Sequence, residues 1–374
     1  MRCALPFILL CLICLGSSLR AAETEPVDSP VVGRDHRVLF RLTAPLATKV
    51  ELRGVQRQLV PLEKDAAGIW SITIGPLAPG IYGYSFIVDG EAMLDPSNPE
   101  IKPERDPDES ELEVTSDPPL LTQWQDVPHG TVHLHDYFSQ PLKRLRRLRV
   151  YTPPGYEHNH NHFPVLYLMH GTGDTEATWT EFGRAHFIED NLLARSKTKP
   201  MIIVMTDGHA DLTDEEGIGQ KNLEKMETDV LRSVIPLVDH TYRTFADAGH
   251  RAICGLSMGG FQSMFIGLRH LDAFAWVCGM SAFVPEPEKN LAAALNDPHT
   301  NDRLRLFWHQ IGKDDYLLPQ QKEFEEVLKK HDIRRQFTVT GGDHSWPVWR
   351  NYLEDLLPVL FLEGEEKSAE KTKK

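Results

Sequence analysis

One short segment places an apolar strand end, a glycine-flanked serine and a helix in direct succession. Residues 255–259 read Gly-Leu-Ser-Met-Gly and follow the apolar residues 252–254. The apolar side chains of residues 261–268 then recur with helical spacing. Glycines two residues to either side of a serine remove the side chains that would collide within a sharp turn. An ordinary serine in a glycine-rich loop would lack the flanking strand and helix. The pattern therefore predicts a strained strand-to-helix turn that projects the Ser257 hydroxyl above a sheet.

In α/β-hydrolases such a turn carries the nucleophile, and an acid and then a histidine follow it along the chain. Residues 304–311 are predicted to form a strand, and the loop after it contains two candidate acids, Asp314 and Asp315, which the residues alone do not separate. A last strand over residues 335–340 leads to His344, the last histidine of the chain. We expect the histidine to take the proton of the serine and one aspartate to orient the imidazole. This chemistry requires no cofactor.

A tetrahedral intermediate also needs two backbone N–H donors. One is expected from Met258, the residue after the nucleophile. The other should lie in the loop after the apolar strand 165–169, which continues as His-Gly-Thr-Gly-Asp. Thr172 is the expected second donor, with Gly173 as the alternative. The other interpretation of this loop is a tight turn without chemistry.

The order and spacing of these motifs resemble the esterase D-like family, and within it carbohydrate esterase family 1, which includes feruloyl and acetylxylan esterases. The resemblance covers roughly residues 120–362 and is carried by segments 151–156, 165–173, 255–260, 312–315 and 341–350. It implies that the acid is the last residue of Gly-x-x-Asp, Asp315. It also matches His344 and Trp346 to a Gly-Gly-x-His-x-Trp segment. The loop reads Gly-Thr-Gly where many relatives have Gly-Gly-Gly or Gly-Ile-Gly, which changes the expected pocket shape but keeps a backbone amide.

Patterning along the chain predicts two domains. Residues 28–103 contain short alternating strands separated by glycine-containing turns, as in a small all-β, immunoglobulin-like sandwich. This region resembles the early-set sandwiches of carbohydrate-binding module family 48. Residues 104–121, rich in Pro, Asp and Glu, are expected to be a linker. From residue 122 to 362 strands and helices alternate, which predicts an α/β-hydrolase domain with a mostly parallel sheet. Its helices are expected near residues 185–194, 222–241, 320–330 and 349–362.

The aromatic residues of the chain raise a choice between core packing and sugar binding. In the sandwich, the alternation of Trp70, Tyr82, Tyr84 and Phe86 favours core packing over a sugar platform. In the hydrolase domain, Trp179 and Trp346 are the expected walls of the substrate pocket. Four other aromatic residues are candidates for which core packing is favoured: Phe182, Phe283, Tyr316 and Trp349.

Residues 1–22 have the pattern of a signal peptide, with an early arginine, a short apolar run and a small-residue end. Cleavage is expected near Ala21 or Ala22, and the mature protein is therefore expected to be secreted or periplasmic. The apolar run is too short to span a bilayer. Two cysteines remain after cleavage, Cys254 and Cys278, and both are expected to be buried thiols, with a disulfide between adjacent strands as the alternative. The charged tail, residues 363–374, is expected to be disordered.

The net charge and the spacing of the histidines limit which classes of partner and ligand are expected. The net charge of −14 argues against nucleic acid or an anionic membrane as the partner. Alternating histidines over residues 158–162 lack an acidic or cysteine cluster, so no metal site is expected.

The sequence therefore predicts a secreted serine esterase that removes feruloyl or acetyl groups from polysaccharide. One alternative is a hydrolase of siderophores or other small esters. An alternative of another class is a carbohydrate-binding protein with weak or no catalysis.

Overall fold

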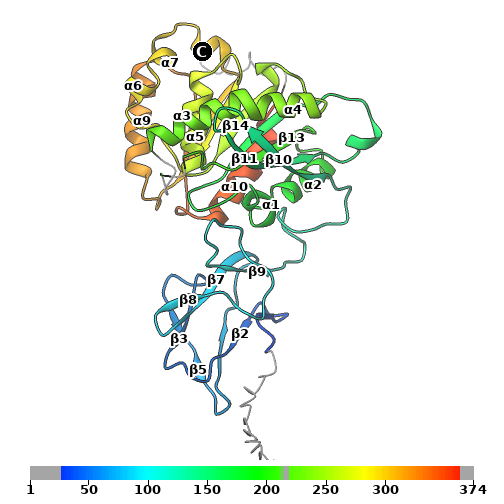
Figure 1. Cartoon of the computed structure of the whole chain (residues 1–374), viewed down its shortest axis with the longest axis vertical. Helices are drawn as coiled ribbons and strands as arrows, with labels where there is room; N and C mark the ends of the chain where they lie inside the picture. The colour runs from blue at the N-terminus through cyan, green and yellow to red at the C-terminus, as the bar shows by residue number, and fades with distance from the viewer. Residues whose placement is uncertain (1–26, 212, 214–218, 363–374) are drawn as a thin grey trace, which may run out of the picture.

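The computed structural model describes residues 27–211, 213 and 219–362. The predicted signal peptide and charged tail lie outside the described residues. An all-β domain (blue to cyan) joins a larger domain of strands and helices along the long axis of the molecule (Figure 1). Within the described part of the chain, no helix is long and apolar enough to cross a membrane.

The all-β domain consists of two antiparallel sheets. One has the strand order β1-β2-β6-β5, formed by Val31–Val32, Val38–Thr43, Ile69–Ile74 and Glu63–Lys64. The other has the order β4-β3-β7-β8, formed by Val60–Pro61, Val50–Arg53, Gly80–Val88 and Glu91–Met93. Strand alternation puts one face of each sheet into a shared core, to which Phe40, Tyr84 and Phe86 contribute fully buried rings. The rings of Phe40 and Tyr84 meet edge to face, with centroids 5.0 Å apart.

Core packing accounts for three of the four aromatic residues considered as a sugar platform. Trp70, Tyr84 and Phe86 are buried in the sandwich. Tyr82 packs only partly against this core, and it also lines a cleft between the two domains.

The segment expected to be a linker, 104–121, is partly a strand. β9 (Ser110–Val114) pairs antiparallel with β7, from Gly80 opposite Val114 to Tyr84 opposite Ser110. Leu112 and Val114 enter the sandwich core, because the apolar and acidic residues of this strand alternate. The acidic composition therefore suggested a linker, although this segment contains a strand with one apolar face.

The larger domain is built on an eight-stranded sheet with the order β10-β11-β13-β12-β14-β15-β16-β17. Only its first pairings, β10 with β11 and β11 with β13, are antiparallel. This confirms the predicted fold class, a mixed sheet with mostly parallel strands preceded by an antiparallel all-β region. In chain order, the strands are Thr131–Ser139, Arg144–Thr152, Val165–Met169, Ile202–Thr206, Arg251–Gly255, Trp276–Met280, Leu306–Gly312 and Gln336–Thr340.

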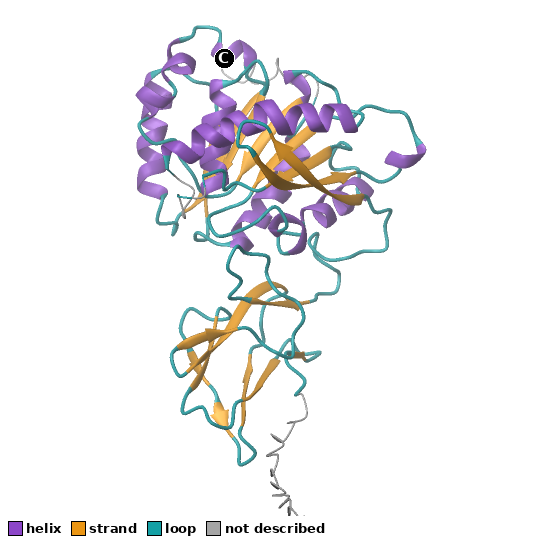
Figure 2. Ribbon diagram, viewed as in Figure 1, coloured by secondary structure: helices purple, strands orange, loops and turns teal. Residues whose placement is uncertain are grey.

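Helices cover both faces of this sheet (Figure 2). On one face, α3 (Gln220–Asp229), α5 (Met258–Arg269) and α9 (Leu318–Lys330) contribute side chains to a core that includes Val165 and Tyr167 of β12. On the other, α1 (Thr178–Glu181), α2 (Ala185–Ala194) and α10 (Trp346–Leu356) contribute side chains to a second core that includes Leu166 and Leu168. The four consecutive strand residues are thus buried alternately in two cores, which explains the unbroken apolar run. Short helices α6, α7 and α8 occupy Pro287–Asn290, Ala292–Asn296 and Thr300–Arg303.

One expected helix is interrupted. Over residues 222–241 the chain forms α3, a π-helical turn η2 (Val230–Val234) and α4 (Ile235–Thr241). Pro236 stands in the first turn of α4. Proline has no N–H to donate to the preceding turn, so the hydrogen-bond pattern changes before it.

The two cysteines in the described part of the chain, Cys254 and Cys278, are buried free thiols, as expected. Burial raises the pKa of Cys278 well above its usual range. Both side chains are completely buried in the same core, where they pack as small apolar groups.

Candidate active site

The turn around Ser257 has the strained geometry that the sequence predicts. Ser257 has φ 48° and ψ −119°, and α5 begins at the next residue. A Cβ placed on Gly255 would lie 2.4 Å from the carbonyl carbon of Gly259, and one on Gly259 would lie 2.5 Å from the carbonyl oxygen of His170. Only glycine allows the strand, the helix and the neighbouring loop to approach so closely, and this approach fixes the direction of the serine side chain.

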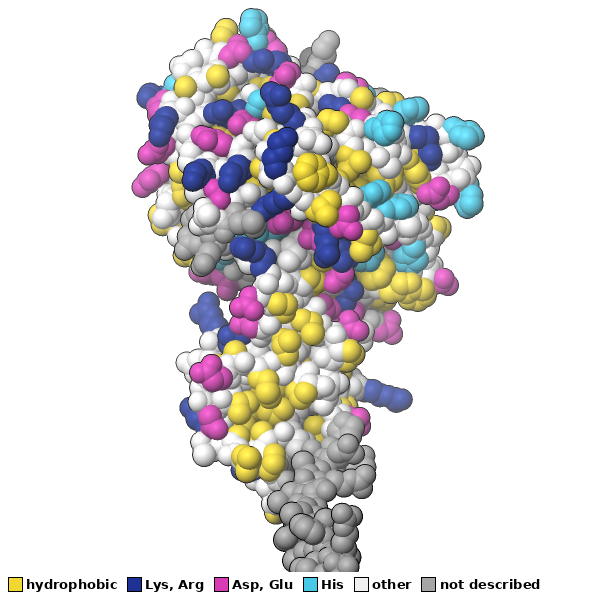
Figure 3. Space-filling model, viewed as in Figure 1, with side chains coloured by type: hydrophobic (Ala, Val, Ile, Leu, Met, Phe, Trp, Pro, Cys, Tyr) yellow, Lys and Arg dark blue, Asp and Glu magenta, His cyan; other side chains and the backbone are white. Residues whose placement is uncertain are grey.

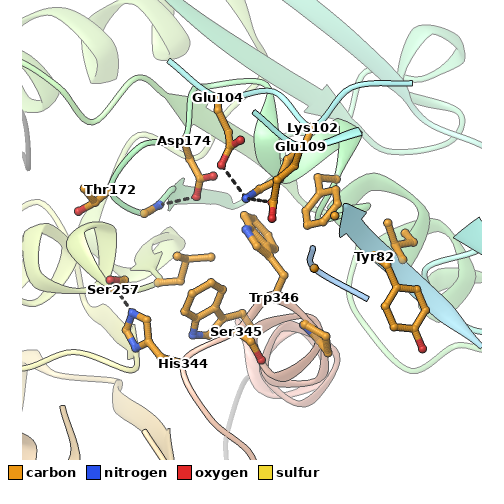
Figure 4. A pocket seen from close by; sticks show the side chains of 18 of the residues that line it. Tyr82, Lys102, Glu104, Glu109, Thr172, Asp174, Ser257, His344, Ser345 and Trp346 are labelled. Atoms are coloured by element: carbon orange, nitrogen blue, oxygen red, sulfur yellow. Dashed lines mark hydrogen bonds and ion pairs between the residues drawn. The ribbon is translucent and has the colours of Figure 1, made fainter. Parts of the chain in front are cut away.

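Three side chains from the ends of three strands form a hydrogen-bonded row. The Ser257 hydroxyl donates to His344 Nε2 at 2.9 Å (Figure 4). His344 Nδ1 lies 3.0 and 2.9 Å from the two carboxylate oxygens of Asp315. The structure thus brings together the predicted serine and histidine with Asp315, while Asp314 is exposed in the same loop.

The environment of Asp315 keeps its carboxylate ionised. The side chain is fully buried, and the backbone N–H of Leu317 donates to Oδ1 at 2.9 Å. Burial alone would raise the pKa of Asp315, but hydrogen bonds from His344 and Leu317 hold it below the usual range. Trp349 Nε1 donates to Ser281 Oγ at 3.0 Å, and the Ser281 hydroxyl in turn hydrogen-bonds the carboxylate.

The loop after β12 passes directly beside the serine. A Cβ on Gly171 would lie 2.6 Å from Leu256 Cδ1 and 3.7 Å from Ser257 Cβ. His170 Nε2 accepts the N–H of Gly208 at 2.8 Å, so its proton is on Nδ1, 2.8 Å from the carbonyl oxygen of Gly171. In one peptide unit the C=O and N–H point in opposite directions, so holding this carbonyl also sets the direction of the Thr172 N–H.

The two expected oxyanion donors therefore come from different elements on either side of the serine. The N–H of Met258 lies in the first turn of α5, where backbone N–H groups have no partner within the helix. Thr172 and Gly173 lie in the loop after β12, and Gly173 adopts a left-handed conformation with φ 83°.

These residues lie in a cleft of about 940 Å³ between the two domains. Ser257 and His344 line this cleft, together with several aromatic rings and the charged side chains of Lys102, Glu104, Glu109 and Asp174. The hydrolase domain contributes Leu256, Phe261, Phe283, Tyr316, Phe182 and Trp346, whereas the sandwich contributes residues 54–57 and 81–83. Core packing was the expected role of Phe182, Phe283 and Tyr316, all of which line the cleft, and Phe261 was not expected there. Phe261 and Tyr316 lie close in sequence to the predicted serine and acid.

The two tryptophans expected in the pocket take different positions. Trp346 lines the cleft. Trp179 does not line it, because it is only 1% exposed and its Nε1 donates to the carbonyl oxygen of Met169 at 2.9 Å. Its ring packs edge to face against Trp346, with centroids 5.0 Å apart. Trp179 thus supports the wall from behind.

Basic and acidic side chains are interspersed on the face shown in Figure 3. Residues 27–211, 213 and 219–362 contain no group of three His, Cys, Asp or Glu side chains placed to hold a metal ion.

Comparison with known proteins identifies the family to which the chain belongs. A model of the Esterase family matches residues 139–360. An endo-1,4-beta-xylanase/feruloyl esterase of Xylanibacter ruminicola is 30% identical over 344 residues, which is 89% of this chain. The match spans 46% of that relative's length, so this chain corresponds to about half of it.

Solved structures agree on the fold. A ferulic acid esterase superposes with a TM-score of 0.52 at 27% identity, covering 62% of this chain and 97% of that chain. An enterobactin esterase of Shigella flexneri superposes with a TM-score of 0.63 at 18% identity, covering 87% of this chain and 94% of that chain. The second similarity extends over the all-β domain as well, and it concerns the fold alone.

Proposed function

Because this chain belongs to the Esterase family of carboxylic ester hydrolases, we propose that it removes acyl groups from polysaccharide through a Ser257–His344–Asp315 triad. The observation that carries the proposal is the hydrogen-bonded row at a cleft lined by several aromatic rings. Relatives of this chain are named as feruloyl esterases, which supports an aromatic acyl group as the one that is removed. Removal of residues 1–22 would place the mature enzyme where polysaccharide is found.

The proposed reaction follows from the protonation states already described. The Ser257 Oγ attacks the ester carbonyl carbon while its proton passes to His344 Nε2. The resulting oxyanion accepts hydrogen bonds from the N–H groups of Met258 and Thr172, with Gly173 as the alternative second donor. The negative charge of Asp315 stabilises the imidazolium that forms.

The second half of the reaction restores the enzyme. The tetrahedral intermediate collapses, the C–O bond to the sugar alcohol breaks, and His344 gives its proton to the departing oxygen. The acyl group remains on Ser257 Oγ. Water then attacks the acyl carbon, His344 accepts the water proton, and the carboxylic acid leaves as the serine is reprotonated.

The cleft supports an acyl group larger than acetyl. A volume of about 940 Å³ lies within the range of sites that hold drug-sized ligands. Phe261 and Phe283 meet edge to face with centroids 5.2 Å apart, and both line the cleft. Such rings offer an apolar surface against which a phenolic ring can stack.

The test is hydrolysis of methyl ferulate beside p-nitrophenyl acetate, with Ser257→Ala as the control. We expect both esters to be cleaved, methyl ferulate with the higher kcat/KM, and the variant to lose at least about a thousandfold in turnover. Acetate release alone would replace the feruloyl assignment by a small-acyl one. If the variant retained a near-normal rate, the proposed nucleophile would be wrong.

The small-ester alternative is supported by the structural similarity to an enterobactin esterase, which includes the sandwich. Competition assays with a catechol-containing cyclic triester separate the two substrate classes. Preference for the triester over feruloylated arabinoxylan fragments would favour this alternative. A folded protein that binds xylan but cleaves none of these esters would favour the binding-protein alternative.

A further inference from the structure

The segment 102–105, which we call the strap, joins the sandwich to the loop beside Ser257. Glu104 forms an antiparallel β-bridge with Asp174. The N–H of Arg105 donates to the carbonyl oxygen of Gly173 at 2.8 Å, and Thr178 Oγ1 donates to the carbonyl oxygen of Pro103 at 2.5 Å. Three successive residues of the strap therefore contact residues 173–178, which follow Thr172 directly.

The strap is itself fixed to the sandwich. The N–H of Lys102 donates to the carbonyl oxygen of Glu109 at 3.0 Å, and Ile101 is bridged to Ser110, the first residue of β9. Because β9 pairs with β7, a continuous set of backbone hydrogen bonds runs from the sandwich sheet to the loop after β12. Loops held at only their ends are more mobile than loops with such lateral pairing.

A buried charge cluster reinforces the strap. Lys102 Nζ lies 2.7 Å from a carboxylate oxygen of Glu104 and 2.9 Å from one of Glu109, and its side chain is only 12% exposed (Figure 4). Burial alone would lower the pKa of Lys102, but the carboxylates of Glu109, Glu104 and Asp174 raise it above the usual range. The lysine therefore supplies the positive charge that allows these acidic groups to lie together.

Asp174 links the cluster to the loop. Its Oδ2 accepts the N–H of Gly171 at 3.2 Å, and the N–H of Asp174 lies 3.3 Å from the carbonyl oxygen of Gly171. This local pairing closes the turn that contains Thr172 and Gly173. Removing the ammonium group would leave Asp174 and Glu104 buried as neighbouring carboxyl groups without the charge of Lys102, a costly arrangement that displacement of the loop would relieve.

We propose that the strap holds the oxyanion loop in its working geometry and that Lys102 is a positioning residue for ester hydrolysis. The proposal rests on the proposed function, because the loop matters only if Thr172 or Gly173 donates to an oxyanion. Donors must be in place before the reaction to stabilise the transition state, so a displaced loop lowers kcat. The sandwich would then support turnover in addition to forming a wall of the cleft.

The first experiment compares Lys102→Met and Lys102→Arg with Lys64→Met. Lys64 binds the carbonyl oxygens of Pro45 and Ala47 inside the sandwich and stands over the Trp70 ring, so its loss tests general damage to that domain. With p-nitrophenyl acetate, we expect Lys102→Met to lower kcat by at least about tenfold with less than about a twofold change in KM. The arginine variant should recover part of this loss, and Lys64→Met should keep the normal kcat.

The second experiment isolates the backbone hydrogen bond. Arg105→Pro and Arg105→Ala both lose the arginine side chain, but only proline also lacks the N–H that binds Gly173. The lower kcat is expected for the proline variant. Melting curves of both variants identify any that fail to fold.

Hydrogen–deuterium exchange of residues 170–176 gives a readout that does not depend on ester hydrolysis. We expect faster exchange there in Lys102→Met and Arg105→Pro than in Lys64→Met and Arg105→Ala. Unchanged exchange would overturn the proposal, as would faster exchange with an unchanged kcat. If the wild-type protein cleaved no ester, the proposed function would fail and the positioning role with it, while exchange would still decide whether the strap holds the loop.

Discussion

Replacing Asp315 by asparagine changes charge and hydrogen bonding at one buried carboxylate while leaving its volume almost unaltered. In the wild-type protein the carboxylate lies within 3.0 Å of His344 Nδ1. When the imidazole becomes charged, two unit charges about 4 Å apart attract by about 4 kcal/mol at an effective dielectric constant near 20. Losing that attraction corresponds to about a thousandfold in rate.

The substitution also changes the hydrogen bonds at this position, and we expect this to lower the rate beyond the effect of the lost charge. The N–H of Leu317 already donates to Oδ1, so this position must remain an oxygen in the variant. The amide NH₂ then occupies the place of Oδ2, 2.9 Å from His344 Nδ1. It would donate to Nδ1 and favour the proton on Nε2, where the ring can no longer accept the proton of Ser257.

The assay is kcat for p-nitrophenyl acetate between about pH 6 and 9, with melting curves as the check on folding. We expect Asp315→Asn to lose about a thousandfold or more across this range. Asp314→Asn is the matched control, since Asp314 is exposed in the same loop and should retain the normal rate. A loss below about tenfold in Asp315→Asn, or a larger loss in the control, would refute the reasoning.

Three further changes test packing, pH dependence and the cleft wall. Gly259→Ala should unfold or strongly destabilise the protein, because the new Cβ would lie 2.5 Å from the His170 carbonyl oxygen; Gly341→Ala, whose Cβ meets nothing within 4 Å, should not change the melting temperature. Burial and the neighbouring Asp355 raise the pKa of Glu354 to about 7, so the stability linked to its neutral form is complete below about pH 4.5 and is lost as the pH rises through 7. Glu354→Gln should therefore raise the unfolding free energy by about 1 to 2 kcal/mol at pH 8 and by much less at pH 5. Chemical denaturation measures this free energy, and an equal increase at both pH values would contradict the reasoning. Tyr316 is 67% exposed, and its ring centroid lies 4.6 Å from that of His344. Tyr316→Ala should therefore fold normally and raise KM for methyl ferulate by several-fold, whereas Tyr316→Phe should leave KM unchanged. If KM did not change in Tyr316→Ala, the Tyr316 ring would not be part of the acyl site.

The central sheet and the strand-to-helix turn were predictable because their signals are local. A five-residue apolar run such as Val165–Met169 is typical of a strand buried on both faces, and the glycines around Ser257 mark a turn that few other residues allow. Asp314 and Asp315 were not separable from their own residues, because both follow the same strand. The N–H of Leu317 and the buried contact with His344 distinguish Asp315, and neither is visible in the sequence. The family resemblance supplied that choice instead.

Prediction failed where a residue's role depends on a partner far away in the chain. Trp179 was expected in the pocket because it follows the loop after β12, but its indole N–H is directed to the Met169 carbonyl oxygen and its ring lies behind Trp346. The segment 104–121 was expected to be a linker because its proline and acidic residues are typical of solvated connections. The alternation of Leu112 and Val114 with acidic residues was a usable signal of β9, which the composition masked.

The strap shows the physical reason for this limit. Lys102, Glu104 and Glu109 would be ordinary solvated charges in an isolated peptide, and nothing in their spacing predicts burial. They form the proposed positioning cluster only because β9 pairs with the sandwich sheet and the strap is bridged to Asp174. The proposed nucleophile can therefore be recognised from a local sequence pattern, whereas the proposed support of the oxyanion loop arises from the contact between the two domains.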